Sequence, residues 1–382
     1  MSDKASLRIA IIGAGPAGLT LTRLLKMQGY TPTVFEKETS PLARPQGGSL
    51  DLHTNSGLRA VHMAGLDLPF QAIARPQDQG LRILDKMGTV LLEDYEQDGH
   101  RPEVDRIELR AMLLDSLAPG SIQWAKALSG VHPTGDGTHA LAFEHGRSET
   151  FDLVVGADGA WSRVRPLLSS ASPMYTGETY VELSIDDIDR RHPDVARLVG
   201  QGTMLAVTGE KGLVAQRNAR GHIRVYAHLR ASTEDLTALG IEEEHPDLAR
   251  TRLLELFAGW HPDLLKVIEV CSDDCIAIRS LYMLPVGHRW DTVPGVTLIG
   301  DAAHLMPPTA GQGVNQAMLD AVELAEALGR SATFEDAIRA YEQPMFERAA
   351  RWAAIAASGL GKIVGKDAPK STLDYFRPFT RS

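Results

Sequence analysis

The sequence predicts an α/β protein with a doubly wound parallel sheet, a second, antiparallel sheet and a long C-terminal helix. Two features predict the parallel sheet. A short apolar run at residues 7–12 leads into the glycine-rich loop GAGPAG, and apolar residues at helical spacing follow this loop. The antiparallel sheet is predicted by residues 171–280, where alternating strands are separated by tight turns such as Gly209–Gly212.

Composition and charge exclude several classes of protein. A net charge of −10 with no basic run excludes nucleic acid as a partner, because a phosphate backbone would be repelled. No segment approaches the roughly 20 apolar residues that span a bilayer, and the polar start indicates no signal peptide. Cys271 and Cys275 lack companion ligands for zinc, so we interpret them as reduced thiols. We expect a cytoplasmic, monomeric protein without a metal.

The first glycine loop has the pattern of a dinucleotide site. Gly13 permits a tight turn, Gly15 lets the backbone approach a pyrophosphate, and Gly18 lets the helix pack on the strand. A second strand at residues 31–35 ends at Glu36, whose carboxylate would bind ribose hydroxyls and repel a 2′-phosphate. The pattern predicts bound FAD or NAD rather than NADP. A glycine turn in an ordinary βα unit is the alternative.

Two further predicted strands are followed directly by a polar turn, which we call a corner. Strands predicted at residues 139–144 and 150–155 end at Asp158-Gly159, which could also be a plain type I turn. An apolar run at residues 296–299 ends at Gly300-Asp301. Its carboxylate therefore lies at the carboxyl end of a strand, where doubly wound sheets bind ligands. Two prolines and a Gly-x-Gly then lead into a helix that begins near residues 311–313.

Taken together, G-x-G-x-x-G…E, D-G-x-x-S-x-V-R and G-D-A-A-H-x-x-P-P-x-x-G-Q-G-x-N, spread over residues 9–330, resemble the group A flavoprotein monooxygenases, the family of para-hydroxybenzoate and phenol hydroxylases. The resemblance implies a Rossmann-like, glutathione-reductase-type FAD domain. It also implies that NADPH or NADH reduces FAD as a transient co-substrate, and that O2 then gives a C4a-hydroperoxyflavin that hydroxylates an electron-rich carbon. A second G-x-G-x-x-G, which a dedicated nicotinamide site would need, is absent from the sequence.

The resemblance also implies which residues contact the cofactor. Asp301 would bind the ribityl chain or the neighbouring phosphate, and the helix N-terminus would face the negative charge of the reduced flavin. No side chain is assigned a catalytic role, because the flavin carries the chemistry. Arg106 would lie over the flavin or its phosphates, with a solvated arginine as the alternative, and His304 is interpreted as a packing histidine. The implied cofactor contacts are Gly13, Gly15, Ala17, Gly18, Glu36, Lys37, Arg44, Gly48, Asp51, Arg106, Asp158, Asp301, Pro308, Gly311, Gly313, Val314 and Asn315.

The chain is expected to divide into three parts. Residues 1–75, 100–170 and 281–340 would form a discontinuous FAD-binding domain, and residues 76–99 and 171–280 a substrate-binding domain whose sheet covers the flavin. Residues 341–382 would form a bracing helix, at 345–363 just past Pro344, and a polar tail. A helix at residues 104–117 is expected to start from Asp105 as its N-cap.

Within the family, the sequence looks most like the tetracycline-inactivating monooxygenases. The stretches GGSLDLH (47–53), RIELRAMLL (106–114) and GDAAHLMPPTAGQGVN (300–315) carry this resemblance. It implies hydroxylation of tetracycline, with Glu182, Thr203, Arg224 and Pro307 as substrate contacts. The first three differ in side-chain type from the best-known member, so another phenolic or polyketide substrate stays open. An FAD-dependent reductase and a flavin-binding regulator without turnover are the alternatives from other classes.

Overall fold

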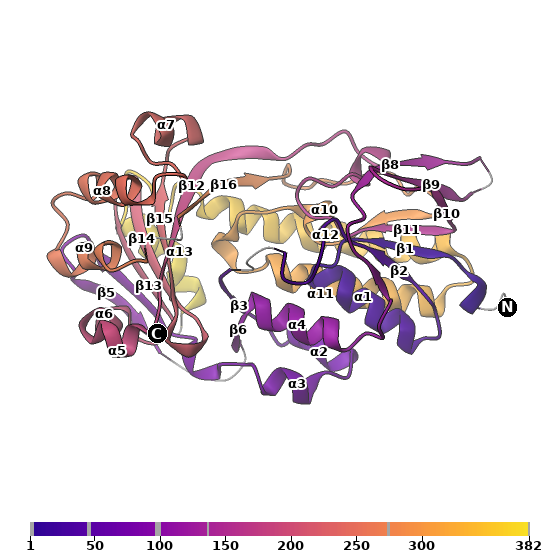
Figure 1. The fold of residues 1–382 in the computed structure, drawn as a ribbon, viewed down its shortest axis with the longest axis horizontal. Coiled ribbons are helices and arrows are strands. Elements are labelled where there is room, and N and C mark those ends of the chain that lie inside the picture. The colour runs from indigo at the N-terminus through magenta and orange to yellow at the C-terminus, as the bar shows by residue number, and fades with distance from the viewer. Residues whose placement is uncertain (1–3, 44–46, 96–100, 136, 273–275, 381–382) are drawn as a thin grey trace.

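The computed structural model describes residues 4–43, 47–95, 101–135, 137–272 and 276–380, arranged as two lobes along the long axis of the molecule (Figure 1). One lobe contains a five-stranded parallel sheet in the order β17-β11-β1-β2-β7. Its strands are β1 (Ile9–Ile12), β2 (Thr33–Phe35), β7 (Ile122–Gln123), β11 (Leu153–Gly156) and β17 (Val296–Leu298).

This parallel sheet is the middle one of three layers. Helices cover one face, and a small antiparallel sheet lies over the other (Figure 1). Phe35 of β2 joins the sheets by contacting the rings of Phe143 and Phe151. The covering elements are α1 (Pro16–Met27), α2 (Gly57–Met63), α3 (Asp67–Gln71), α4 (Arg106–Asp115), α11 (Gly313–Arg330), β8 (Leu128–Pro133), β9 (His139–Phe143) and β10 (Glu149–Phe151).

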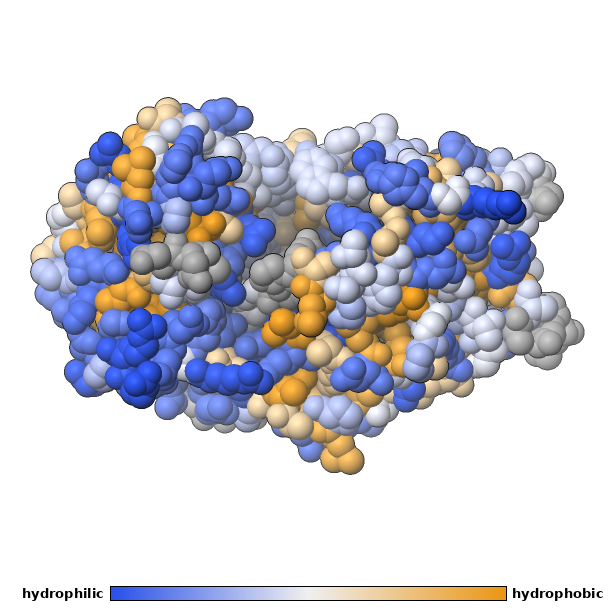
Figure 2. Space-filling view, viewed as in Figure 1, coloured by the Kyte–Doolittle hydropathy of each residue, from blue (hydrophilic) through white to orange (hydrophobic). Residues whose placement is uncertain are grey.

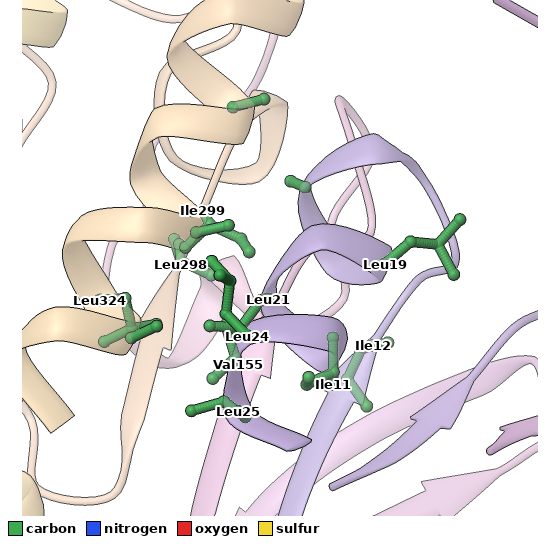
Figure 3. Close-up of a cluster of buried hydrophobic side chains, with 14 of the residues drawn as sticks. Ile11, Ile12, Leu19, Leu21, Leu24, Leu25, Val155, Leu298, Ile299 and Leu324 are labelled. Carbon is green, nitrogen blue, oxygen red and sulfur yellow. The ribbon is translucent and has the colours of Figure 1, made fainter. Parts of the chain in front are cut away.

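The core of this lobe forms where α1 and α11 pack on the central strands. Leu21, Leu24 and Leu25 of α1 point toward Val155 of β11, and Leu324 of α11 closes the cluster (Figure 3). All are buried, as strands covered on both faces require. This apolar packing fixes the loops at the strand ends.

The other lobe contains a seven-stranded sheet in the order β16-β12-β15-β14-β13-β4-β5. All neighbours are antiparallel except β4 and β13. The hairpins predicted within residues 203–229 are confirmed. The hairpin predicted within residues 76–99 adds to the same sheet as β4 and β5. The strands are β4 (Leu81–Asp85), β5 (Val90–Asp94), β12 (Met174–Ile185), β13 (Thr203–Thr208), β14 (Lys211–Arg217), β15 (Ile223–Leu229) and β16 (Ala277–Met283).

The two faces of this sheet have different partners. Val181, Leu213 and Val225 belong to one buried apolar cluster, together with residues of the outer helices. On the opposite face, Leu205 and Val207 pack with Val364 and Tyr375 of the C-terminal segment. The remaining helices are α5 (Ile188–Arg191), α6 (Pro193–Val199), α7 (Thr233–Ala238), α8 (Pro246–Leu256), α9 (Pro262–Glu269), α10 (Asp301–His304), α12 (Phe334–Gly359) and α13 (Lys370–Phe376).

Two boundaries differ from the sequence prediction. The strand predicted at residues 150–155 is two strands in different sheets, because Asp152 turns away to exchange hydrogen bonds with Arg8. The C-terminal helix begins at Phe334, not after Pro344, since Thr333 caps it by accepting a hydrogen bond from Asp336 N. Pro344 lies inside this helix, where packing of its buried face outweighs the missing N–H.

The predicted N-cap of α4 is only half correct. Asp105 precedes the helix, but its side chain makes no cap hydrogen bond. Its carboxylate binds Arg75 at 2.8 Å and accepts a hydrogen bond from Asn218 Nδ2 at 3.0 Å. Asp105 therefore connects the two lobes, which a local reading of the sequence could not detect.

We predict that Gly18→Ala destabilises the apoprotein by about 1–3 kcal/mol. The new Cβ would lie 2.1 Å from the backbone oxygen of Gly13 and 3.3 Å from Ile11 Cγ2. The Gly13 backbone and α1 can move apart only if the helix separates from the sheet. Urea denaturation measures the change. Gly329→Ala in α11 is the matched control, because its Cβ would make ordinary contacts with Gln28 and should be neutral or mildly stabilising.

Candidate cofactor and substrate site

Three polar corners meet at the carboxyl edge of the parallel sheet. Because β1, β11 and β17 run in the same direction, the Gly13–Gly15 loop lies beside Asp158 and Asp301. Gly13 has a φ of 110°, and a Cβ there would lie 2.3 Å from the carbonyl oxygen of Ala157. Only glycine allows the first loop to pack this closely on the second.

Glu36 fastens the end of β2 to the first loop. Its carboxylate accepts hydrogen bonds from Ala14 N at 2.7 Å and from Glu38 N at 3.0 Å. The residue is buried, as expected for an acidic group at the base of a dinucleotide loop. Lys37, the next residue, is exposed.

The open space at this edge fits a ligand with phosphates and hydroxyls. A Cβ on Gly15 would meet no atom within 4 Å, so nothing in the protein fills the place in front of the N-terminus of α1. Asp158 Oδ1 is buried without a hydrogen-bond partner, and burial raises the pKa of this carboxyl. The Asp301 carboxylate is exposed and makes no hydrogen bond or ion pair with any described residue. FAD carries the complementary groups.

Arg165 joins the second and third corners. Its guanidinium is buried and donates to the carbonyl oxygens of Ala302 at 2.8 Å, Ala160 at 2.8 Å and Asp301 at 3.2 Å. The two arginines of the second corner thus differ, since Arg163 is exposed. Arg165 holds the backbone that carries the Asp301 carboxylate.

A strap of residues 47–57 lies along the beginning of α11. Its strand β3 (Ser49–Asp51) pairs with β6 (Glu103–Asp105). Asn315, fully buried, donates to the carbonyl oxygen of Asp51 at 2.8 Å and accepts from His53 N at 2.8 Å. Its side chain therefore fastens the strap to α11. A Cβ on Gly311 would lie 3.2 Å from Asp51 Oδ1, so Asp51 faces the glycine bend.

Arg110, which the sequence analysis did not single out, lies against the glycine loop. Arg110 Nε donates to the carbonyl oxygen of Ala14 at 3.1 Å, and its Nη2 pairs with Glu38 at 2.9 Å. Arg106 is exposed on the first turn of α4. The sequence held a signal for Arg110, because it follows Leu109 on the apolar face of the helix, where an unpaired arginine would be costly.

Three of the four predicted substrate residues, Glu182, Thr203 and Arg224, lie on one face of the second sheet. Thr203, Gln216 and Arg224 are in register across β13, β14 and β15. Glu182 on β12 pairs with Arg224 at 2.7 Å and with Arg279 at 3.0 Å. Arg279 was missed in the sequence, where nothing marks it. The face is the one opposite the buried cluster of this lobe.

This polar face meets the strap. A Cβ on Gly47 would lie 2.9 Å from Arg224 Nη2, and one on Gly48 would lie 3.1 Å from the Tyr226 hydroxyl. Burial raises the pKa of Tyr226 to about 12, so the phenol stays a hydrogen-bond donor. The surface is hollowed between the two lobes (Figure 2), and this hollow is the candidate substrate site.

The other predicted cofactor residues have different surroundings. Ala17 is buried in α1, Pro308 and Gly311 are exposed in the bend, and Gly313 and Val314 are half-buried in the first turn of α11. Pro307, predicted to contact substrate, is buried. Arg44 lies outside the described residues. His304 is buried against Asp320, at 2.7 Å, as a packing histidine would be.

The described residues contain neither a metal-binding cluster nor a membrane-spanning helix. No group of three or more His, Cys, Asp or Glu residues there is placed to hold a metal. No helix of the described part has the length and apolarity to cross a membrane. Cys271 is a buried free thiol whose pKa is raised to about 12 by burial, and Cys275 lies outside the described residues.

A three-layer dinucleotide lobe with an open carboxyl edge, facing a polar sheet, defines a flavin-binding oxidoreductase. The family model described as FAD binding domain matches residues 6–355, so the chain belongs to this family. Monooxygenase penA of Penicillium thymicola is 35% identical over 88% of this chain and 90% of its own. The 3-amino-4-hydroxybenzoate 2-monooxygenase of Streptomyces cremeus is 29% identical over 90% of this chain and 84% of its own. The protein is a flavoprotein monooxygenase that uses FAD.

Solved structures share the fold. Klebsiella pneumoniae HpxO, complexed with FAD and uric acid, superposes with a TM-score of 0.83 at 22% identity, covering 98% of this chain and 93% of its own. The tetracycline destructase Tet(51) superposes with a TM-score of 0.70 at 20% identity, covering 97% and 96%. At these identities the likeness concerns the fold. The expected tetracycline specificity therefore stays a prediction.

We predict that Gly15→Val removes FAD without unfolding the apoprotein. The valine would occupy the open space in front of α1, where the pyrophosphate must approach the backbone, and its Cβ would meet no protein atom within 4 Å. Flavin absorbance per protein measures FAD content, and urea denaturation measures apoprotein stability. A yellow Gly15→Val protein would contradict this placement of the cofactor.

A pair of carboxyl groups, one on the strap and one on the neighbouring strand β6, predicts that the stability of the protein depends on pH. Asp51 and Glu103 are partners across β3 and β6, where like charges repel. Burial, and then the charge of Asp51, raises the pKa of Glu103 to about 8, against the effects of Ser49 and Arg75. Glu103 is therefore mostly protonated at neutral pH, and its Oε2 accepts a hydrogen bond from Ser49 Oγ.

We predict that the free energy of unfolding falls between pH 4.5 and 8 because of Glu103. The folded state binds this proton more tightly than the unfolded state, so its stabilisation is present below the unfolded pKa of 4.5 and is lost as the pH rises through about 8. The slope from this one group is up to about 1.4 kcal/mol per pH unit. Denaturation of the wild type and Glu103→Gln across this range measures it, and equal slopes would refute it.

Proposed function

We propose that this protein hydroxylates an aromatic or enolic small molecule that reacts as an anion, with NADPH or NADH as the reductant. The proposal rests on one observation, which is that two walls of the candidate site face each other. One wall is the carboxyl edge of the parallel sheet, where Asp158 Oδ1 has no hydrogen-bond partner and the Asp301 carboxylate is exposed. The other is the polar face of the second sheet. FAD held on the first wall would supply the activation of O2.

The chain's own residues would bind the cofactor and orient the substrate. Gly15 and the N-terminus of α1 would hold the pyrophosphate, Glu36 the ribose and Asp301 the ribityl chain. The first turn of α11, at Gly313, would face the flavin ring with its partial positive charge. The sheet over the strap would exclude water from the reacting carbon.

Charge supports an anionic substrate. The charges of Arg224, Arg106 and Arg279 act to lower the pKa of Tyr226, against burial and Glu182, the carboxylate that pairs with Arg224 and Arg279. Arg224 Nε is buried without a partner, and Tyr226 has no hydrogen bond to any described residue. An oxyanion of a phenol, enol or carboxylate would satisfy both groups.

The relatives support an aromatic substrate. The name of the Streptomyces cremeus relative gives a hydroxybenzoate as what it acts on, and that compound carries both a phenol and a carboxylate. Tetracycline is the second candidate, supported by the GGSLDLH stretch of the strap and by the fold likeness to Tet(51). Both are electron-rich at a ring carbon next to an ionisable hydroxyl.

The deciding experiment follows O2 uptake by the purified holoprotein with NADPH or NADH, in the presence of 3-amino-4-hydroxybenzoate or tetracycline. Mass spectrometry then detects the gain of one oxygen atom. Substrate-dependent O2 uptake with this gain identifies the substrate. NAD(P)H oxidation that needs a substrate but no O2 would identify a reductase instead. FAD binding without any substrate-stimulated NAD(P)H oxidation would favour a regulator.

We predict that Arg224→Gln raises the KM for the anionic substrate about tenfold or more, because a hydrogen bond to a charged group is lost. Arg217→Gln is the matched control. Arg217 lies next to Gln216 on the other face of the sheet and pairs with Asp189 at 3.0 Å. A flavin-absorbance titration with the substrate checks binding separately from turnover, and equal affinities of the two variants would refute the role of Arg224.

A further inference from the structure

A buried cluster of charges lies behind the third corner. Asp320 of α11 pairs with His304 of α10 at 2.7 Å and with Arg348 of α12 at 3.0 Å. The exposed fractions of these side chains are 0%, 3% and 13%. Burying these charges costs desolvation energy. Their contribution to the protein must therefore lie in the parts of the chain that they hold in place.

The charges in this cluster are mutually compensating. Burial alone would raise the pKa of Asp320, but His304 and Arg348 hold that pKa below its usual value. Burial alone would lower the pKa of His304, but Asp320 raises it. The cluster is thus an ion-paired set in which Asp320 is the central anion.

The same carboxylate fixes the peptide that precedes Asp301. Asp320 Oδ2 accepts a hydrogen bond from Gly300 N at 2.8 Å. Gly300 has φ 63° and ψ −143°, a conformation that favours glycine, and a Cβ there would lie 3.0 Å from Ala317 Cβ. The direction of the exposed Asp301 carboxylate therefore depends on a residue that lies 20 positions further along the chain.

Hydrogen bonds continue from the cluster to the strap. Arg348 Nη1 donates to Gln316 Oε1 at 2.8 Å, and Gln316 Nε2 donates to Gln312 Oε1 at 2.9 Å. Gln312 Nε2 lies 3.2 Å from His53 Nδ1, and His53 Nε2 lies 2.7 Å from Asp51 Oδ2. The contacts of this cluster thus extend to Asp51 at the glycine bend and to Gly300, next to Asp301.

We propose that Asp320 is a cofactor-positioning residue. Through Gly300 it holds the corner that carries Asp301, and through Arg348 it holds the strap that carries Asp51. The inference rests on the proposed placement of FAD between these two carboxylates. If the corner relaxes in the apoprotein, the apparent dissociation constant of FAD rises by the inverse of the fraction that stays organised.

The test measures FAD affinity and apoprotein stability separately. Asp320→Asn keeps the size of the side chain but removes its charge, and we expect the FAD dissociation constant to rise about tenfold or more. Glu342→Gln is the matched control. Glu342 is also fully buried, and it binds Trp290 Nε1 at 2.8 Å and Thr297 Oγ1 at 2.9 Å. This control should lose stability and keep the wild-type affinity for FAD.

Each outcome decides the proposal. A rise in the dissociation constant for Asp320→Asn beyond that of Glu342→Gln supports it, and equal affinities in the two variants overturn it. If Asp320→Asn does not fold, Arg348→Lys decides in the same titration: a smaller rise supports the proposal, and wild-type affinity overturns it. FAD titration needs no substrate, so failure of the proposed substrate leaves this result unaffected.

Discussion

The parallel register of β17, β11 and β1 is the constraint on which the rest of the structure depends. Parallel strands end at the same edge of a sheet, so three loops far apart in the sequence converge there. The close contact of Gly13 with Ala157 and the hydrogen bonds of Arg165 lock these loops together. The open space in front of α1 exists because glycine occupies position 15.

Polar groups around this edge have two different tasks. The side chains of Arg165, Asn315 and Arg110 donate hydrogen bonds to backbone carbonyl oxygens of neighbouring loops. They therefore shape the site. Asp301 and one oxygen of Asp158 are left without partners among the described residues. For Asp158 Oδ1, which is buried, the missing partner is costly unless a ligand supplies one.

The second sheet brings charged side chains to the strap. Its inner face is joined to the strap through Arg224, Glu182 and Tyr226, and to the C-terminal segment through Leu205 and Val207. The strap therefore lies against both the cofactor lobe and the second sheet. A substrate held between them would contact groups from three separate parts of the chain.

The sequence by itself determined the fold class, the FAD-binding family and the corners at Gly13–Gly18, Asp158 and Asp301, because short-range signals such as strand, glycine turn and helix lie within a few residues. Tertiary structure alone decided the rest. Arg110 binds the glycine loop, Pro344 lies inside α12, and Asp105 bridges the lobes instead of capping α4. These outcomes depend on partners that are distant in sequence, such as Asp320 with Gly300, and no local pattern encodes which distant groups the folded chain brings together.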